Sequence, residues 1–194
     1  MSKTSFIRPL DVLTFGGLGL LSGGLTVYAY TQGVTGEPLA LLGFISVVFV
    51  AIYVVFLVWR YKFLSKISFT TKHGLHIITN GFPVGQMAVE AVTEETIERW
   101  TKVLNEVTGR YDWRSKCEDS IKELFIQFQD FPIQHSSMGK VAGWAVGDNI
   151  IVGFKKPLVN TALAHELGHY MYKAYTGTFE NTNCHKFMQE HGLK

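Results

Sequence analysis

Residues 161–177 read TALAHELGHYMYKAYTG, a run with apolar residues at helical spacing that Gly177 ends. His165 and His169 are four residues apart, so a helix places both imidazoles on one face, one turn apart. Glu166 follows the first histidine, where its carboxylate can reach a water molecule held by a metal ion at the two imidazoles. This H-E-x-x-H arrangement predicts a zinc site with His165 and His169 as ligands and Glu166 as general base.

A catalytic zinc site usually has a third protein ligand and leaves a fourth position to water. Several residues after His169 have suitable side chains: Glu180, Cys184, His185, Glu190 and His191. His185 lies 16 residues beyond His169 and Glu190 lies 21 residues beyond it, and both distances allow the chain to return to the metal. Spacing alone therefore does not decide whether His185 or Glu190 is the third ligand.

The motif resembles zincin metallopeptidases, and it is most similar to minimal SprT-like and WLM-like domains. The similarity covers about residues 150–188 and includes the run Asn183-Cys-His-Lys-Phe-Met188. In those domains a third histidine begins a helix after the H-E-x-x-H helix, which implies His185 as the third ligand with Phe187 packed behind it. Thermolysin-like enzymes use a glutamate from a later helix instead, and Glu190 is the residue at a compatible distance here. We expect His185 to be the ligand, because Glu190 lies on a short terminal helix that is prone to fraying.

The same resemblance implies a substrate site beside the metal helix. In this fold family the strand before that helix commonly pairs with an extended substrate, and the matching residues are Ile150, Ile151, Val152, Gly153 and Phe154. A core strand is the alternative. Tyr172 lies seven residues after His165, on the same helix face, and is a candidate donor to an oxyanion, with core packing as its alternative.

Two long apolar runs begin the chain. Residues 12–30 are 19 residues without a charge, and residues 39–59 are another 21. A helix needs about 20 apolar residues to cross a bilayer, so both runs are predicted to span a membrane as a helical hairpin over residues 1–63. Gly19 and Gly23 form a G-x-x-x-G pair, which favours close packing on the second run or self-association of two chains.

Basic residues lie at both outer ends of this hairpin. Residues 1–8 contain two of them and residues 60–66 contain three, whereas residues 31–38 contain none. The positive-inside tendency predicts that both termini, and the metal domain with them, are cytoplasmic. The chain is therefore expected to be integral to a cytoplasmic or viral membrane, with the lipid bilayer as a partner.

The rest of the chain is electrically balanced. Residues 64–194 contain 14 Lys plus Arg and 14 Asp plus Glu, so no basic surface predicts nucleic-acid binding. Cys117 and Cys184 form no disulfide framework and suit a reducing compartment.

The expected fold class is α+β: a zincin-like domain of a small sheet and an active-site helix, preceded by two transmembrane helices. Residues 64–89 are predicted to be a tether with short strands, and residues 90–194 to be the metallopeptidase domain. Within it we expect a helix from Thr93 to Gly109, an amphipathic helix over residues 113–125 and a hairpin or bent strand over residues 141–154.

These patterns predict a membrane-anchored zinc peptidase that hydrolyses protein or peptide substrates, with Glu166 as general base. One alternative is a structural or assembly component of a membrane, for instance of a virus, in which the zincin domain is vestigial. Another is a module that binds extended peptides without cleaving them.

Overall fold

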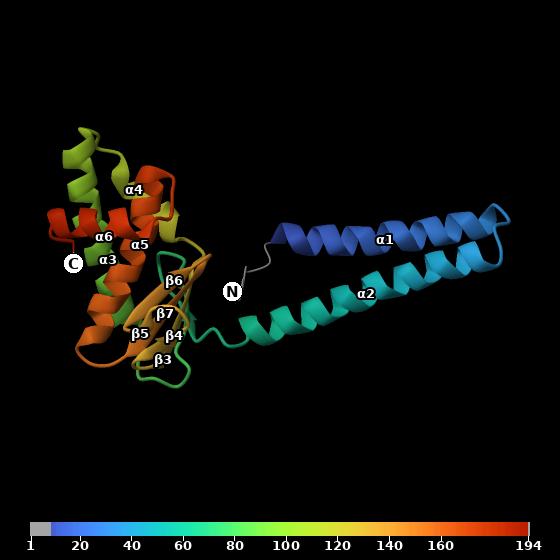
Figure 1. The fold of residues 1–194 in the computed structure, drawn as a ribbon, viewed down its shortest axis with the longest axis horizontal. Helices are drawn as coiled ribbons and strands as arrows, with labels where there is room; N and C mark the ends of the chain where they lie inside the picture. Colours follow the sequence, from blue (N-terminus) through green and yellow to red (C-terminus); the bar gives the residue numbers. More distant parts are fainter. Residues whose placement is uncertain (1–8, 194) are drawn as a thin grey trace. The chain divides into compact units, whose positions relative to one another are not determined.

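The structure is a computed structural model that describes residues 9–193, with side-chain surroundings described for residues 17–18, 20–59 and 61–193. The chain divides between Ser65 and Lys66 into two compact units, a helical hairpin and a mixed α+β unit (Figure 1). The predicted α+β class is confirmed for the second unit.

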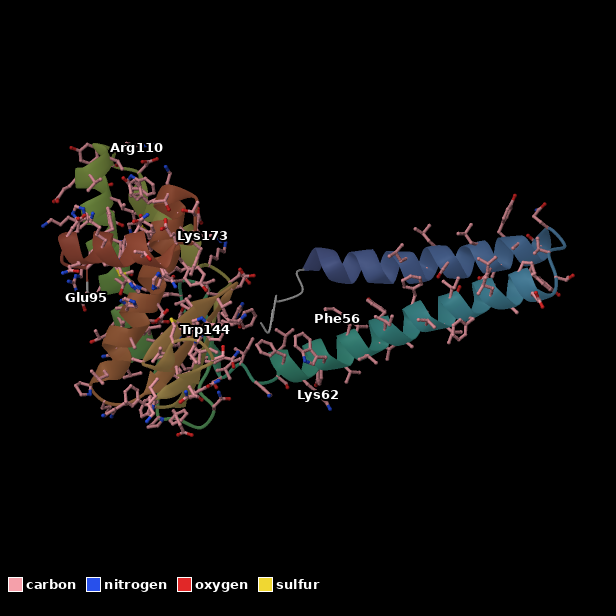
Figure 2. All side chains as sticks on the ribbon, viewed as in Figure 1. Phe56, Lys62, Glu95, Arg110, Trp144 and Lys173 are labelled. Atoms are coloured by element: carbon pink, nitrogen blue, oxygen red, sulfur yellow. The ribbon has the colours of Figure 1, made fainter. Side chains whose placement is uncertain are left out.

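The hairpin consists of α1 (Pro9–Thr31) and α2 (Glu37–Leu64) packed side by side (Figure 1). The hydroxyl oxygens of Thr26 on α1 and Ser46 on α2 lie 3.1 Å apart, which gives the two helices a polar contact. Side chains of α2, Phe56 and Lys62 among them, project outward along its whole length (Figure 2). Most of its large apolar side chains are exposed in the described part of the chain.

Among the described residues α2 is the one helix long and apolar enough to cross a membrane. Its 28 residues correspond to about 42 Å of helix, more than the hydrocarbon core of a bilayer requires. The first predicted run lies within α1, and its crossing stays a prediction. Gly19 lies outside the residues whose surroundings are described, and a Cβ at Gly23 would meet no atom within 4 Å.

The second unit contains a five-stranded sheet in the order β1-β2-β3-β7-β6 and a separate hairpin of β4 and β5. Strands β2, β3 and β7 are parallel, and the edge strands β1 and β6 are antiparallel to their neighbours. The strands are β1 (Phe69–Thr70), β2 (His76–Ile78), β3 (Phe125–Asp130), β4 (Ile133–His135), β5 (Gly139–Val141), β6 (Gly143–Val146) and β7 (Asn149–Phe154). The helices are α3 (Gln86–Thr108), α4 (Trp113–Ile121), α5 (Leu158–Thr176) and α6 (Asn181–Glu190).

One core joins the sheet to the helices. Ile126 and Phe128 on β3 and Ile150 on β7 alternate with less buried neighbours, so one face of the sheet is apolar. This face packs with Trp100 of α3 and Leu167 of α5, both of which are fully buried. The sheet and α3 therefore fix α5, the helix with the H-E-x-x-H motif.

The structure differs from the expected organisation at three points. Residues 64–89 contain the expected short strands, β1 and β2, but these strands belong to the main sheet and the compact unit begins at Lys66 rather than at residue 90. The helix expected over residues 113–125 ends at Ile121, because Glu123 has a left-handed backbone (φ 64°) and Phe125 begins β3. The helix expected from Thr93 already begins at Gln86.

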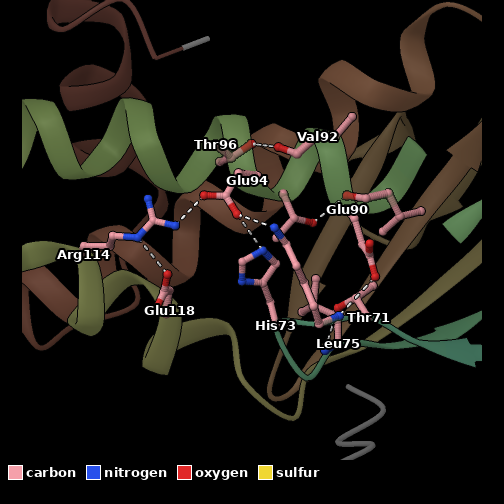
Figure 3. Close-up of polar contacts among 12 residues, drawn as sticks. Thr71, His73, Leu75, Glu90, Val92, Glu94, Thr96, Arg114 and Glu118 are labelled. Carbon is pink, nitrogen blue, oxygen red and sulfur yellow. Dashed lines mark hydrogen bonds and ion pairs between the residues drawn. The ribbon is translucent and has the colours of Figure 1, made fainter. Parts of the chain in front are cut away.

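An ion-pair cluster holds the β1–β2 turn against α3 and α4 (Figure 3). The Glu94 carboxylate on α3 lies 2.8 Å from Lys72 Nζ and accepts a hydrogen bond from Arg114 on α4. His73 Nε2 lies 3.1 Å from the same carboxylate. Lys72 and then Arg114 lower the pKa of Glu94 from 4.5 to about 2, so Glu94 is charged at neutral pH.

Candidate metal centre

Three histidine side chains from two helices converge at one point of the α+β unit. His165 and His169 come from successive turns of α5, and His185 comes from α6. His185 Nε2 lies 3.1 Å from His165 Nε2 and 3.3 Å from His169 Nε2. Their candidate ligand atoms all lie within 4.8 Å of one another, so the three residues are close enough to hold a metal ion.

Two of the three separations between these nitrogens are close to those expected at a tetrahedral zinc ion. Zinc–nitrogen bonds are about 2.0–2.1 Å long, and two tetrahedral ligands at that distance are about 3.3–3.4 Å apart. The two separations from His185 Nε2, 3.1 and 3.3 Å, are close to that value. Burial, aided by the charges of His165 and His185, lowers the pKa of His169 to about 4, so at neutral pH its imidazole is uncharged and can bind a metal.

The position of α6 is set by contacts on its side away from the metal. Phe187 stacks on Trp100 of α3 with ring centroids 5.7 Å apart, and Met188 is fully buried. Beyond the helix, Arg99 on α3 donates a 2.7 Å hydrogen bond to the carbonyl of Gly192, and Leu193 is buried. The end of the chain is therefore held against α3, which keeps α6 in place.

Gly168 allows this packing within the motif itself. A Cβ at this position would lie 2.7 Å from Met188 Cε and 3.0 Å from Trp100 Cζ2. A side chain here would require the Met188 methyl group and the Trp100 ring to shift from their observed positions. The glycine before His169 is thus explained by the close approach of the helix that carries His185.

Glu166 lies beside the histidines and is 6% exposed. Burial raises the pKa of its carboxyl from 4.5 to about 7. The carboxyl faces β6, where Gly143 lacks a side chain: a Cβ there would lie 2.8 Å from both Cγ and Oε1 of Glu166. Gly143 therefore provides the space that the Glu166 carboxyl occupies.

A cavity of about 480 Å³ opens beside these residues. It is lined by Met138, Val141, Ala142, Gly143, Trp144, Ala145, Leu158, Thr161, Ala162, His165, Glu166, His169, Asn181 and His185. One wall is the first half of α5 and another is the β5–β6 segment. The three histidines and Glu166 are therefore accessible to a small molecule or a chain segment.

The strand beside this cavity is β6, not the expected strand Ile150–Phe154. Those residues form β7, which is paired with β3 on one side and with β6 on the other. Because both edges of β7 are occupied, it cannot pair with a substrate. The uninterrupted apolar residues Ile150, Ile151 and Val152 are typical of a strand with neighbours on both sides.

Two further predicted residues lie away from the cavity. The ring of Tyr172 packs with Phe187 and Tyr175, with centroids 5.5 and 6.2 Å apart, and Tyr172 is absent from the cavity lining. Core packing, the alternative stated for it, is what the structure shows. Glu190 is the last residue of α6 and lies 3.8 Å from Lys186 in an ion pair.

Tyr170 positions the edge strand, a role that the neighbouring sequence does not indicate. Its hydroxyl lies within hydrogen-bond distance, 3.1 Å, of the carbonyls of Gly147 and Asn149, at the turn between β6 and β7. This contact ties that turn to α5, the helix with the motif. It therefore helps to keep β6 beside the metal site.

No family model, curated protein or solved structure matches this chain.

Proposed function

We propose that this chain is a membrane-anchored zinc-dependent peptidase. The observation that carries the proposal is the convergence of the His165, His169 and His185 imidazoles, with Glu166 beside them in the same cavity. Three histidines at this spacing suit zinc, and they leave a fourth position for water or substrate. A carboxyl next to such a position is the usual arrangement for hydrolysis.

Different residues of the chain would perform different steps of this reaction. A zinc ion held by the three imidazoles would lower the pKa of water and polarise a carbonyl group. Glu166 would accept a proton from the attacking water and then transfer it to the nitrogen of the departing amine. The unpaired edge of β6 would hold the substrate in extended form through backbone hydrogen bonds.

We propose that α1 and α2 anchor the chain in a membrane. Helix α2 supplies one span, and α1 is proposed to supply the second, so that both termini and the metal domain lie on the cytoplasmic side of a cytoplasmic or viral membrane. Substrates would then be proteins or peptides that reach that side of the bilayer.

Metal analysis and turnover test the proposal together. The purified full chain should contain about one zinc per chain and should hydrolyse unstructured peptides. Glu166→Gln should retain the zinc and lose hydrolysis, because only the proton acceptor is removed. Glu98→Gln, the same chemical change on the exposed surface of α3, is the matched control and should leave both properties unchanged. Retained turnover in Glu166→Gln would refute the proposed role of this residue.

A peptide-binding module is the second candidate, because the cavity and the unpaired β6 edge serve binding as well as cleavage. Tight binding of extended peptides by the zinc-loaded wild type, without any cleavage, would favour it.

A further inference from the structure

The side chain of Phe179 covers the ring of one candidate metal ligand, His169. The two rings are stacked, with centroids 5.7 Å apart and an angle of 26° between their planes. Phe179 also lies edge-on to the ring of Tyr170, with centroids 5.3 Å apart and an angle of 73°. Both distances are within the range in which aromatic rings attract each other. Phe179 therefore contacts two successive residues of α5 at the end of the H-E-x-x-H motif.

Phe179 reaches these rings because the chain turns directly after α5. Gly177 ends the helix with a left-handed backbone (φ 78°), a conformation that glycine adopts without steric cost. The hydroxyl of Thr176 then donates a 3.2 Å hydrogen bond to the carbonyl of Thr178. The loop between α5 and α6, residues 177–180, is thus short and bonded to the end of α5. It holds Phe179 between the two helices that carry the histidines.

The second contact of Phe179, the ring of Tyr170, is itself fixed. Tyr170 is 3% exposed, and its hydroxyl lies 3.1 Å from two carbonyl oxygens at the turn between β6 and β7. The ring cannot move away without losing these hydrogen bonds, so it is a rigid support for Phe179. Phe179 is 38% exposed, whereas His169 is 6% exposed. The phenylalanine therefore shields the stacked face of the His169 ring from water.

His169 has no other support of this kind. A histidine that binds a metal is usually oriented by its second ring nitrogen, which donates a hydrogen bond to a carboxylate, a carbonyl or water. Nε2 of His169 faces the cluster, since it lies 3.3 Å from Nε2 of His185. Among the residues whose surroundings are described, none forms a hydrogen bond with Nδ1 of His169. Its ring contacts there are with His165, His185 and Phe179, so Phe179 alone comes from outside the cluster.

We propose that Phe179 is a positioning residue that fixes the orientation of the His169 imidazole for metal binding, an inference that rests on the proposed function. Because α5 fixes the backbone of His169, the direction of its Nε2 depends on its side-chain torsions. A ring that lies flat against Phe179 cannot turn about its Cβ–Cγ bond without striking the phenylalanine ring. Stacking thus does for His169 what a hydrogen bond to the second nitrogen does at most metal sites.

Zinc affinity is the first test, and it requires no turnover. The full chain in detergent is stripped of metal with a chelator and titrated with zinc in competition with a zinc-chelating dye. Phe179→Ala should weaken zinc binding about 10- to 100-fold, the usual effect of removing a group that orients a ligand. Phe179→Tyr keeps the stacked ring and should bind zinc as tightly as the wild type. Tyr111→Ala removes an aromatic side chain that is 91% exposed; it is the matched control and should have no effect.

Phe179→Leu separates orientation by the ring from simple cover. Leucine keeps an apolar side chain over His169 but has no flat ring, so zinc binding should still be weakened about tenfold. Zinc affinity equal to that of the wild type in Phe179→Leu or in Phe179→Ala would overturn the positioning role. If Phe179→Ala does not fold, as thermal unfolding of the metal-free chain would show, Phe179→Leu decides the question.

Cobalt(II) bound in place of zinc reports the geometry of the site, because its visible absorption depends on the number and arrangement of its ligands. Phe179→Ala should alter the absorption bands of the cobalt-loaded wild type, and Phe179→Tyr should reproduce them. A loss of stability without a change in ligand geometry would leave the bands of the folded chain as they are. Unchanged bands in Phe179→Ala would therefore refute the inference.

Peptide hydrolysis, measured on the same zinc-loaded samples, separates this inference from the proposed function. Weaker zinc binding by Phe179→Ala, together with a wild type that binds zinc but cleaves no peptide, would support the role of Phe179 and reject the peptidase. Equal zinc binding by Phe179→Ala and the wild type, with cleavage by the wild type, would reject the role of Phe179 and leave the peptidase.

Discussion

Replacing Gly143 by Ala tests whether this glycine exists to make room for Glu166. The added methyl carbon would lie 2.8 Å from Cγ and Oε1 of Glu166 and 3.1 Å from its Cδ. Ordinary contacts between such atoms are about 3.5–4.0 Å, so the two groups must separate by about 0.7 Å or more. Glu166 is 6% exposed and lines the cavity, so its carboxyl would have to move toward the cavity to make room for the methyl group.

This overlap should lower both the unfolding free energy and, if the chain is a peptidase, kcat. Overpacking of this kind typically costs about 1–3 kcal/mol of unfolding free energy, so Gly143→Ala should lower the stability of the α+β unit by that amount. If the chain is a peptidase, displacement of the general base by nearly 1 Å should reduce kcat about 10²-fold. Zinc content should not change, because the three atoms nearest to the new methyl group all belong to Glu166 and not to the histidines.

A double-mutant cycle assigns the cost to Glu166. Unfolding free energies are measured for the full chain in detergent, with Gly143→Ala introduced into the wild type and into Glu166→Ala. In the second background the carboxyl is gone, and the substitution should cost less than about 0.5 kcal/mol. Gly85→Ala is the control, because a Cβ at this extended residue would meet no atom within 4 Å. An equal cost of Gly143→Ala in both backgrounds would refute the reasoning.

Three other outcomes can be checked. His185→Ala should weaken zinc binding by orders of magnitude, whereas Glu190→Ala should leave it nearly unchanged, as measured by competition with a zinc-chelating dye; the opposite ranking would make Glu190 the ligand. A tag after Lys194 should be protected from protease in intact cells and a tag within residues 31–38 should be accessible; the reverse pattern would contradict the proposed topology. Glu94→Gln should lower stability by about 1–2 kcal/mol at pH 7, since the Glu94 carboxylate is 25% exposed and has two cationic partners. Because the folded pKa of Glu94 is lowered from 4.5 to about 2, the wild-type advantage is present above pH 5 and should disappear as the pH falls toward 2; a difference independent of pH in thermal unfolding would contradict the assignment.

The parts of the site that lie within one helix could be predicted from the sequence. The four-residue spacing of His165 and His169 fixes their shared face once the segment is helical, and Gly177 ends that helix with a left-handed backbone as expected. The hairpin of β6 and β7, with its turn at Gly147, likewise follows from local pattern. In these cases the determining contacts are between residues close in the sequence.

The order of the strands could not be predicted in the same way. An apolar run such as Ile150–Val152 shows that a strand is buried, but the identity of its neighbours depends on where β3 lies. The sequence pattern predicts helix up to Phe125, the first residue of β3, because the amphipathic spacing of Trp113, Cys117 and Ile121 leads directly into this strand. The interruption is the left-handed backbone at Glu123, a conformation that a glutamate seldom adopts and that its neighbours do not indicate.

The position of the candidate third ligand, His185, depends both on residues close in the sequence and on contacts with distant segments. A ten-residue helix such as α6 is too short to be stable alone, so local sequence cannot decide where His185 points. Phe187 and Met188 bind the far side of α6 to α3 and α5, and this packing requires the missing side chain at Gly168. The residues that follow α6 are held in place, because Leu193 is buried and Arg99 donates a hydrogen bond to the carbonyl of Gly192. These contacts between residues distant in the sequence also keep His185 directed toward the other two histidines. Glu190 lies outside the histidine cluster: its carboxylate is 3.8 Å from Lys186 Nζ and its side chain is 56% exposed.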